Sequence, residues 1–372
     1  MFEEVLKRDE AVTLKLRDLY ERHGYQKYKM SRFEAYDLYL DHRSFLNTQH
    51  IITFSDMDGR VLALKPDVTL SIAKNTRATR NSSEKLYYLE NVYRFDAASR
   101  IYREIPQLGL ECFGALDGFA LGEVVCLAAQ TLGEISSRNI LTLSHTGFVL
   151  KLMEGLSIDQ DVRTELIRSI HLKRSHEILS FASRYGITDA VAQMLSGISE
   201  LDGMFPDTIR KARNMAILPS MSEALDQLEC VYTMLCEAGL QENVRLDFSL
   251  IVDTDYYSGL MFEGFVEGLP RPVLSGGYYG GLMQKFNRNL DAIGFAVYLN
   301  ELGFLYSADG QAGGGTVVLY DEDADPVLLY RSVQELIRQG KRVRTERAVP
   351  ADLKPETVYR FREGILEEVR QC

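Results

Sequence analysis

An aspartate and a threonine, Asp67 and Thr69, follow a strand-like run that ends at Pro66 and lie at the start of a predicted helix over 68–74. Where a strand ends and a helix begins, a carboxylate and a hydroxyl could together hold an ammonium group. Helix capping is the alternative, because Asp and Thr at a helix N-terminus satisfy backbone N–H groups that lack a partner. Taken alone, these two residues favour capping.

A second set of polar residues alternates along a predicted strand with the sequence EIPQLGLECFGAL. Gln107, Gly109 and Glu111 share one face of that strand, because successive side chains point to opposite faces. The glycine is expected to leave space for a ligand between the two polar side chains. On the preceding predicted strand, Arg94 could direct its guanidinium at an anionic group. The alternative for Glu111 is a paired surface charge on an edge strand.

Two adjacent tyrosines lie in the stretch DFSLIVDTDYYSGLMFEGF, residues 247–265. Tyr256 and Tyr257 follow Asp255 between apolar runs, where their rings could enclose a ligand. Tyrosines of a core or an interface are the alternative. The stretch contains no lysine or arginine.

A glycine-rich segment, LSGGYYGGLMQKF, occupies residues 274–286. It lacks the GxxxxGK[ST] and GxGxxG patterns of phosphate-binding loops. Its glycines suit tight turning and a close approach of the backbone to a ligand.

The composition bounds the class of protein. With 372 residues and 46% hydrophobic content, the chain can form two or three domains. The formal net charge of −11 argues against a broad surface for nucleic acids. The chain has no run of eighteen apolar residues, so we expect no membrane span. Its N-terminus is charged, so we expect no signal peptide. The five cysteines form no CxxC pair, which indicates a reducing, cytoplasmic location, and we expect no metal and no cofactor.

The predicted elements place these residues in an α+β fold. Hydrophobic periodicity predicts a helix over 2–22, and residues 51–67 form a predicted hairpin with a type I′ turn at Asp58–Gly59. Helical segments at about 150–240 indicate an insertion, after which strands return. We expect a main domain, a flexible linker and a small α/β module ordered strand, helix, strand, strand, helix. These parts cover 1–306, 307–315 and 316–372, respectively.

The order of four motifs along residues 5–305 resembles that of the histidyl-tRNA synthetase family. The motifs are LALKPDVT, YRFD…PQLGLE, DYYSGLMFEGF and GGYYGGL…AIGFAVYLNEL. The third and fourth together are the most specific part of the resemblance. It implies a class II aminoacyl-tRNA synthetase-like fold, with an antiparallel six-stranded sheet flanked by helices, a helical insertion, and a dimer.

The resemblance also implies a set of histidine-binding residues. Those of the first motif match residues that receive the α-ammonium group. Gln107 and Glu111 of the second match residues on the ammonium and neighbouring polar groups, and Arg94 matches the one arginine of the family pattern that is kept. The tyrosines match a pair that encloses and hydrogen-bonds the imidazole, with an aspartate orienting them. In motif order the residues are Asp67 and Thr69; Arg94, Gln107 and Glu111; and Asp255, Tyr256 and Tyr257.

Departures from that family's pattern remove positive charge. Adenylation requires cations positioned at the α-phosphate, and Val252 stands where the family has an arginine. The family's GGRYDGL is here GGYYGGL, and its final glutamate–arginine pair is here Asn300 and Glu301. The C-terminal module is shorter than the family's anticodon-binding domain. Adenylation is therefore not expected.

A chain that keeps the amino-acid pocket but loses ATP- and tRNA-binding residues resembles the ATP phosphoribosyltransferase regulatory subunits. That resemblance implies a non-catalytic subunit, a dimer within a hetero-oligomer, that binds histidine. It would mediate activation and feedback inhibition of the short-form catalytic subunit in the first step of histidine biosynthesis. One alternative is a diverged histidyl-tRNA synthetase or amino-acid ligase paralogue, with Lys285 and Arg288 as substitute cations. Another is a histidine-sensing or tRNA-binding module with a different partner.

Overall fold

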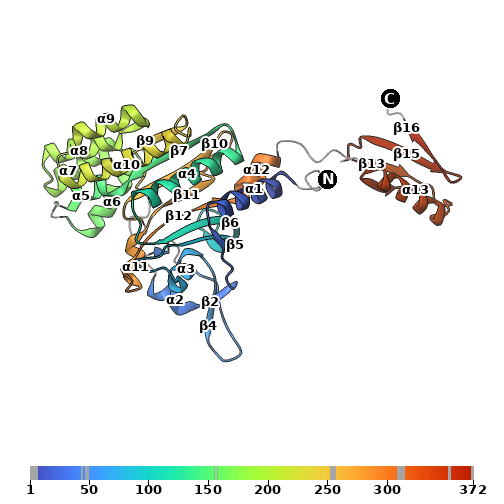
Figure 1. Ribbon diagram of the computed structural model, residues 1–372, viewed down its shortest axis with the longest axis horizontal. Coiled ribbons are helices and arrows are strands. Elements are labelled where there is room, and N and C mark those ends of the chain that lie inside the picture. The colour runs from blue at the N-terminus through green and yellow to red at the C-terminus, as the bar shows by residue number, and fades with distance from the viewer. Residues whose placement is uncertain are drawn as a thin grey trace. The chain divides into compact units, whose positions relative to one another are not determined.

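The computed structural model describes the chain in eight pieces. It divides into two compact units, Met1–Phe304 and Leu305–Cys372, which are described separately (Figure 1). The described residues are 7–42, 45–46, 50–154, 156, 158–251, 257–307, 315–350 and 353–369.

A nine-stranded sheet forms the frame of the first unit. The six central strands run antiparallel, as the resemblance implied, and three short strands extend the sheet at its two ends. In spatial order the strands are β1 (Gln26–Lys27), β5 (Glu84–Asp96), β6 (Ile101–Gly114), β12 (Asp291–Tyr298), β11 (Leu274–Tyr278), β10 (Leu260–Val266), β7 (Asn139–His145), β9 (Val244–Asp247) and β8 (Asp202–Met204). The α+β, class II synthetase-like prediction is confirmed, although β7 and β8 were not expected from the sequence.

One face of the sheet is covered by the apolar helix α4 (Gly118–Ile135), which packs against β7, β10, β11 and β12. Its N-terminus is capped by the Asp117 carboxylate, which accepts a hydrogen bond from Ala120 N at 2.9 Å. Helix α1 (Arg8–Arg22) packs on α4, with the Tyr20 hydroxyl 3.0 Å from Thr131 Oγ1. By length and composition α4 could span a membrane, but it lies in the core, as such helices do in soluble proteins.

The opposite face of the sheet carries a smaller layer. It holds a second core cluster and is built mainly from the first quarter of the chain. Its elements are the three-stranded sheet of β2 (Phe33–Ala35), β4 (Val61–Leu64) and β3 (Thr53–Ser55), with helices α2 (Tyr36–Asp41), α3 (Thr69–Asn75) and α11 (Gly280–Lys285).

The turn of the β3–β4 hairpin differs from the predicted type I′ turn. That type needs a positive φ at both central residues, and of Asp58 and Gly59 only the glycine has one, at 77°. The Asp56 carboxylate accepts hydrogen bonds from Asp58 N at 2.9 Å and Arg60 N at 2.8 Å. These bonds and the closing pair of Asp56 N with Arg60 O define a longer, three-residue loop.

The helical insertion gathers at one end of the sheet (Figure 1). Between its helices it contains the short strand β8, which pairs with β9, so the insertion contributes to the sheet. Phe205 and Tyr232 stack at 3.9 Å between ring centroids and join two of its helices. The helices at this end are α5 (Thr146–Glu154), α6 (Gln160–His171), α7 (Ser175–Tyr185), α8 (Asp189–Ser199), α9 (Phe205–Met215) and α10 (Pro219–Glu237). Helix α12 (Leu299–Ser307) follows the last strand of the sheet.

The C-terminal unit is a four-stranded sheet with one helix. The helix predicted at its end is wrong, because residues 365–369 form a strand that pairs antiparallel with the preceding one. Glu363 and Gly364 both have positive φ, 49° and 83°, which is the geometry of a two-residue hairpin turn. In sheet order the strands are β14 (Val343–Glu346), β13 (Thr316–Leu319), β15 (Thr357–Arg362) and β16 (Ile365–Val369), with helix α13 (Pro326–Arg338).

Candidate functional site

A pocket of about 270 Å³ lies on the face of the sheet away from α4. Its floor is formed by β5, β6, β12, β11 and β10, and its walls come from the smaller layer and from Tyr257. Six of the predicted site residues line it. They are Asp67, Thr69, Arg94, Gln107, Glu111 and Tyr257.

Strand register explains why residues distant in sequence meet here. One row of directly paired residues crosses the sheet from Glu111 through Gly294 and Gly277 to Met261. Small residues in the middle of the row keep the floor low between the side chains at its ends. A Cβ atom built at Gly294 would lie 2.0 Å from Glu111 Oε2, so a larger residue would displace the carboxylate. The parallel row next to it runs from Tyr88 to Glu263.

Glu111 is the most buried acidic residue of the pocket, with 2% of its surface exposed. It lies on an interior strand, so the alternative of a surface charge on an edge strand is wrong. Thr69 Oγ1 donates to Oε1 at 2.6 Å, and the Tyr279 hydroxyl donates to Oε2. Burial raises the pKa of Glu111 to about 8, against the lowering effect of these two donors. The ligand-free pocket therefore holds this carboxyl mainly protonated near neutral pH.

Asp67 serves the helix and the pocket with different oxygens. Its Oδ1 accepts a hydrogen bond from Leu70 N at 2.8 Å, so the capping alternative is correct for that atom. Its Oδ2 lies 3.7 Å from Arg94 Nη2. Burial raises the pKa of Asp67, while Arg94 and the backbone donors oppose that shift. Arg94 also donates from Nε to Pro66 O at 2.8 Å, which fixes its guanidinium at the pocket wall.

Gly109 does not leave space for a ligand, contrary to the expectation. Gly109 and Tyr88 are directly opposite on β6 and β5, and the Tyr88 ring covers the glycine. A Cβ atom at Gly109 would lie 2.0 Å from Tyr88 Cζ. The glycine thus allows a buried tyrosine to form a wall of the pocket, between Gln107 and Glu111.

The tyrosine motif is described only from Tyr257 onward. Tyr257 lines the pocket and its ring packs over Gly277, because a Cβ atom there would lie 2.7 Å from Tyr257 Cδ1. Asp255, Tyr256 and Val252 lie outside the described residues. Their expected roles remain predictions.

Several lining residues were not predicted from the sequence, among them Tyr279, Tyr298 and Glu263. Tyr279 belongs to the glycine-rich segment and donates to Glu111. Tyr298 ends β12 opposite Gln107, and Glu263 lies on β10 opposite Ser275. Burial, together with the negative charge of Asp247, raises the pKa of Glu263 to about 7. The alternation of Met261 with Glu263 on an interior strand was the available signal.

The positions at which the resemblance implied a loss of charged residues have other contacts here. In the glycine-rich segment, the Tyr278 hydroxyl donates to Asp291. Asn300 Nδ2 donates to Glu301 Oε1 at 2.9 Å, and neither residue lines the pocket. The substitute cations of the synthetase alternative do not line the pocket either.

These two cations are engaged by neighbouring groups. The Arg288 guanidinium donates to the carbonyls of Thr76 and Lys74 at the end of α3. Lys285 Nζ lies 4.0 Å from the centre of the Phe45 ring. Among the described lining residues the pocket thus combines three carboxyl groups with a single guanidinium, that of Arg94. Such a set suits a small ligand with a cationic part and one anionic group.

Comparison with known proteins assigns the family. A model of the histidyl-tRNA synthetase family matches residues 2–302. An ATP phosphoribosyltransferase regulatory subunit of Thermoanaerobacter sp. (strain X514) is 30% identical over 288 residues, covering 76% of this chain and 74% of that protein.

Solved structures share the fold. An ATP phosphoribosyltransferase regulatory subunit/histidyl-tRNA synthetase from Bacillus halodurans C has a TM-score of 0.73 at 24% identity, covering 93% of this chain and 90% of that one. A chain of the ATP phosphoribosyl transferase (HisG:HisZ) complex from Thermotoga maritima has a TM-score of 0.62 at 19% identity, covering 78% and 97%. This chain therefore belongs to the histidyl-tRNA synthetase family and, within it, to the ATP phosphoribosyltransferase regulatory subunits.

Proposed function

We propose that the chain binds histidine in the pocket and thereby regulates a short-form ATP phosphoribosyltransferase catalytic subunit, without catalysing a reaction itself. The observation that carries the proposal is the charge pattern of the pocket: Asp67, Glu111 and Glu263 against Arg94. The pocket volume of about 270 Å³ lies at the lower end of the range of roughly 300–1,000 Å³ for ligand sites. Both features suit one amino acid better than a nucleoside triphosphate.

Histidine matches the polar groups of the pocket. Its α-ammonium is proposed to meet Asp67 and Gln107, and its α-carboxylate to meet Arg94. Its imidazole N–H is proposed to donate to Glu111, whose carboxylate can accept more than the two bonds that it has now. Binding beside Glu111 favours the ionised carboxylate, which then forms a charge-assisted hydrogen bond.

Regulation follows if histidine binds one conformation of the assembled complex more tightly than the other. The ligand then shifts the complex towards that state, and feedback inhibition results when that state has low activity. The Thermotoga maritima neighbour is a chain of an ATP phosphoribosyl transferase (HisG:HisZ) complex, which supports a catalytic subunit as partner. We propose a cytoplasmic hetero-oligomer in which this chain is a dimer.

Calorimetric titration of the purified chain with histidine and with ATP tests this proposal. We expect histidine to bind with one site per chain and ATP not to bind in the pocket. Histidine-dependent ATP–pyrophosphate exchange would instead support the synthetase alternative. Failure of histidine to bind, both alone and with the catalytic subunit present, would overturn the proposal.

A further inference from the structure

Lys173 occupies a backbone position that glycine normally takes. It follows the last turn of α6 and has a φ of 53°. Lys173 N donates to Ile170 O and Arg174 N donates to Ser169 O, both at 2.9 Å. This pattern of hydrogen bonds ends many helices with a left-handed residue, most often glycine. A lysine there has a steric cost that glycine avoids, which favourable contacts of its side chain can offset.

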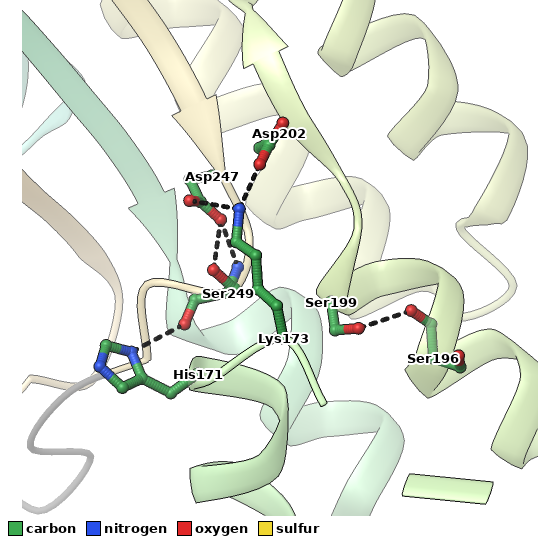
Figure 2. A network of polar contacts seen from close by, with 7 residues as sticks. All are labelled: His171, Lys173, Ser196, Ser199, Asp202, Asp247 and Ser249. Atoms are coloured by element: carbon green, nitrogen blue, oxygen red, sulfur yellow. Dashed lines mark hydrogen bonds and ion pairs between the residues drawn. The ribbon is translucent and has the colours of Figure 1, made fainter. Parts of the chain in front are cut away.

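The ammonium group of Lys173 joins two carboxylates of the neighbouring strands (Figure 2). Asp202 on β8 and Asp247 on β9 are directly opposite each other, an arrangement in which like charges repel. Lys173 Nζ lies 3.0 Å from Asp247 Oδ2 and also contacts Asp202 Oδ2. Partial burial lowers the pKa of Lys173, but the two carboxylates outweigh it and the net shift is upward.

Asp247 also contacts the turn that follows β9, residues 248–251. Its Oδ1 accepts hydrogen bonds from Ser249 N at 2.9 Å and from Ser249 Oγ at 2.6 Å. Ser249 is buried, and its carbonyl oxygen lies 3.2 Å from Nδ1 of His171 at the end of α6. Figure 2 shows that His171, at the end of α6, and Lys173, just after it, approach Ser249 and Asp247, respectively. The turn is further tied by Phe248 N, which donates to Leu201 O at 3.1 Å.

Asp247 ends β9, which pairs with β7, and β7 pairs with β10, where Glu263 lines the pocket. Residue 251 is six positions before Tyr257, which lines the pocket. Asp247 also acts on the pocket through space, because its charge contributes to the raised pKa of Glu263. The Asp247 carboxylate that Lys173 contacts is therefore two strands away from a pocket carboxyl in the same sheet.

We propose that Lys173 is a positioning residue for the pocket: by bridging Asp202 and Asp247 it holds the turn at 248–251 and couples the helical insertion to ligand affinity. The part about affinity rests on the proposed histidine binding. Movement of the insertion, for example on contact with a partner subunit, then changes the affinity of the pocket through this bridge.

The substitution Lys173→Gly separates positioning from stability. It removes the ammonium group, and it also removes the steric cost of a side chain at a residue with positive φ. We expect the thermal midpoint to change little, and the histidine Kd to rise by about three- to thirtyfold, the range for coupling through such networks. Lys173→Arg is expected to keep the wild-type Kd. Arg174→Ala, which removes the adjacent exposed cation, is the matched control and is expected to have no effect.

A second substitution tests the repulsion between the carboxylates. In the Lys173→Gly background, Asp202→Asn removes one opposing charge and is expected to restore most of the affinity. An unchanged Kd in Lys173→Gly would overturn the proposal. The proposal would also be overturned if Lys173→Arg weakened histidine binding as much as Lys173→Gly does, and Asp202→Asn failed to restore it.

Amide hydrogen exchange distinguishes failure of this proposal from failure of histidine binding. Leu250 N and Ile251 N donate within the turn, to Asp247 O and Ser249 O. In ligand-free Lys173→Gly their exchange is expected to accelerate, while exchange in α4 stays unchanged. If wild-type protein does not bind histidine, this result still tests the bridge, and equal exchange rates in both proteins would contradict it.

Discussion

Two groups of carboxylates on the same sheet have opposite surroundings. At the end of the sheet next to the insertion, Asp202 and Asp247 share the ammonium group of Lys173, and Asp247 also accepts two hydrogen bonds from Ser249. In the pocket, burial raises the pKa of Glu111 and Glu263. The first pair is neutralised by a cation of the chain, whereas Glu111 accepts hydrogen bonds from neutral hydroxyl groups only, and raised pKa values of this kind are common at functional sites.

The largest effect is expected at Glu111. Replacement by Ala removes the deepest acceptor of the pocket, so the histidine Kd should rise by about 10- to 150-fold, as expected for a hydrogen bond to a charged group. Isothermal titration measures the change. Glu104→Ala, which removes an exposed carboxylate from the same strand, is the matched control and should bind as wild type.

Arg94 should distinguish the two ends of the ligand. Arg94→Met removes the guanidinium proposed to bind the α-carboxylate, and we expect about tenfold weaker histidine binding. Histamine has the imidazole and the amine but lacks the carboxylate, so its affinity should not fall. Equal losses for both ligands in a competition assay would place the carboxylate elsewhere.

Histidine binding should release a proton from the pocket. The pKa of Glu111 is about 8 without histidine, and the imidazole N–H that is proposed to donate to this carboxyl favours its ionised form. Affinity should therefore increase as the pH rises from 7 towards 8, above the usual imidazole pKa of about 6.5. Titrations in buffers of different ionisation enthalpy measure the proton, which Glu111→Gln should not release.

The same carboxyl should make the ligand-free chain less stable at alkaline pH. Its folded-state pKa, about 8, lies above the ordinary value of 4.5, so its contribution is complete below that ordinary value and is lost as the pH rises through 8. Between pH 5 and 9 the thermal midpoint should fall less in Glu111→Gln. The difference should be a few degrees, because about 1 kcal/mol shifts the midpoint by roughly 2–4 °C in domains of 150–250 residues.

A smaller effect is expected from Tyr279→Phe. The tyrosine hydroxyl donates to Glu111 and lowers its pKa. Without that donor the carboxyl is harder to ionise, and histidine affinity should fall by about two- to tenfold, the worth of an ordinary hydrogen bond. A shift of the pH profile to higher pH would show that the loss acts through Glu111. An unshifted profile would mean that Tyr279 contacts the ligand itself.

The sequence predicted the main residues of the pocket better than their surroundings. Alternation along one strand was enough to place Gln107 and Glu111 on one face, because strand geometry is local. It could not show that Tyr88 covers Gly109, since that contact depends on the register between two strands. Tyr279 was missed for a similar reason, because its partner Glu111 is 168 residues away.

Local patterns also misled where pairing decides the structure. Residues 362–371 were predicted as a helix, but the hairpin turn at Glu363–Gly364 pairs residues 365–369 with β15. Tertiary pairing commonly overrides intrinsic preference in short segments. The bridge at Lys173 could not be predicted from the sequence either, because it joins the end of a helix to two strands that are distant in the sequence.

Feedback inhibition of the reconstituted complex tests the account most directly. The activity of a short-form catalytic subunit should be measured against histidine concentration, with wild-type regulatory chain and with Glu111→Ala. We predict that both chains activate the catalytic subunit, and that the histidine concentration for half inhibition is at least about tenfold higher with the variant. Equal inhibition with both chains would contradict the account, because histidine would then act at a site outside this pocket.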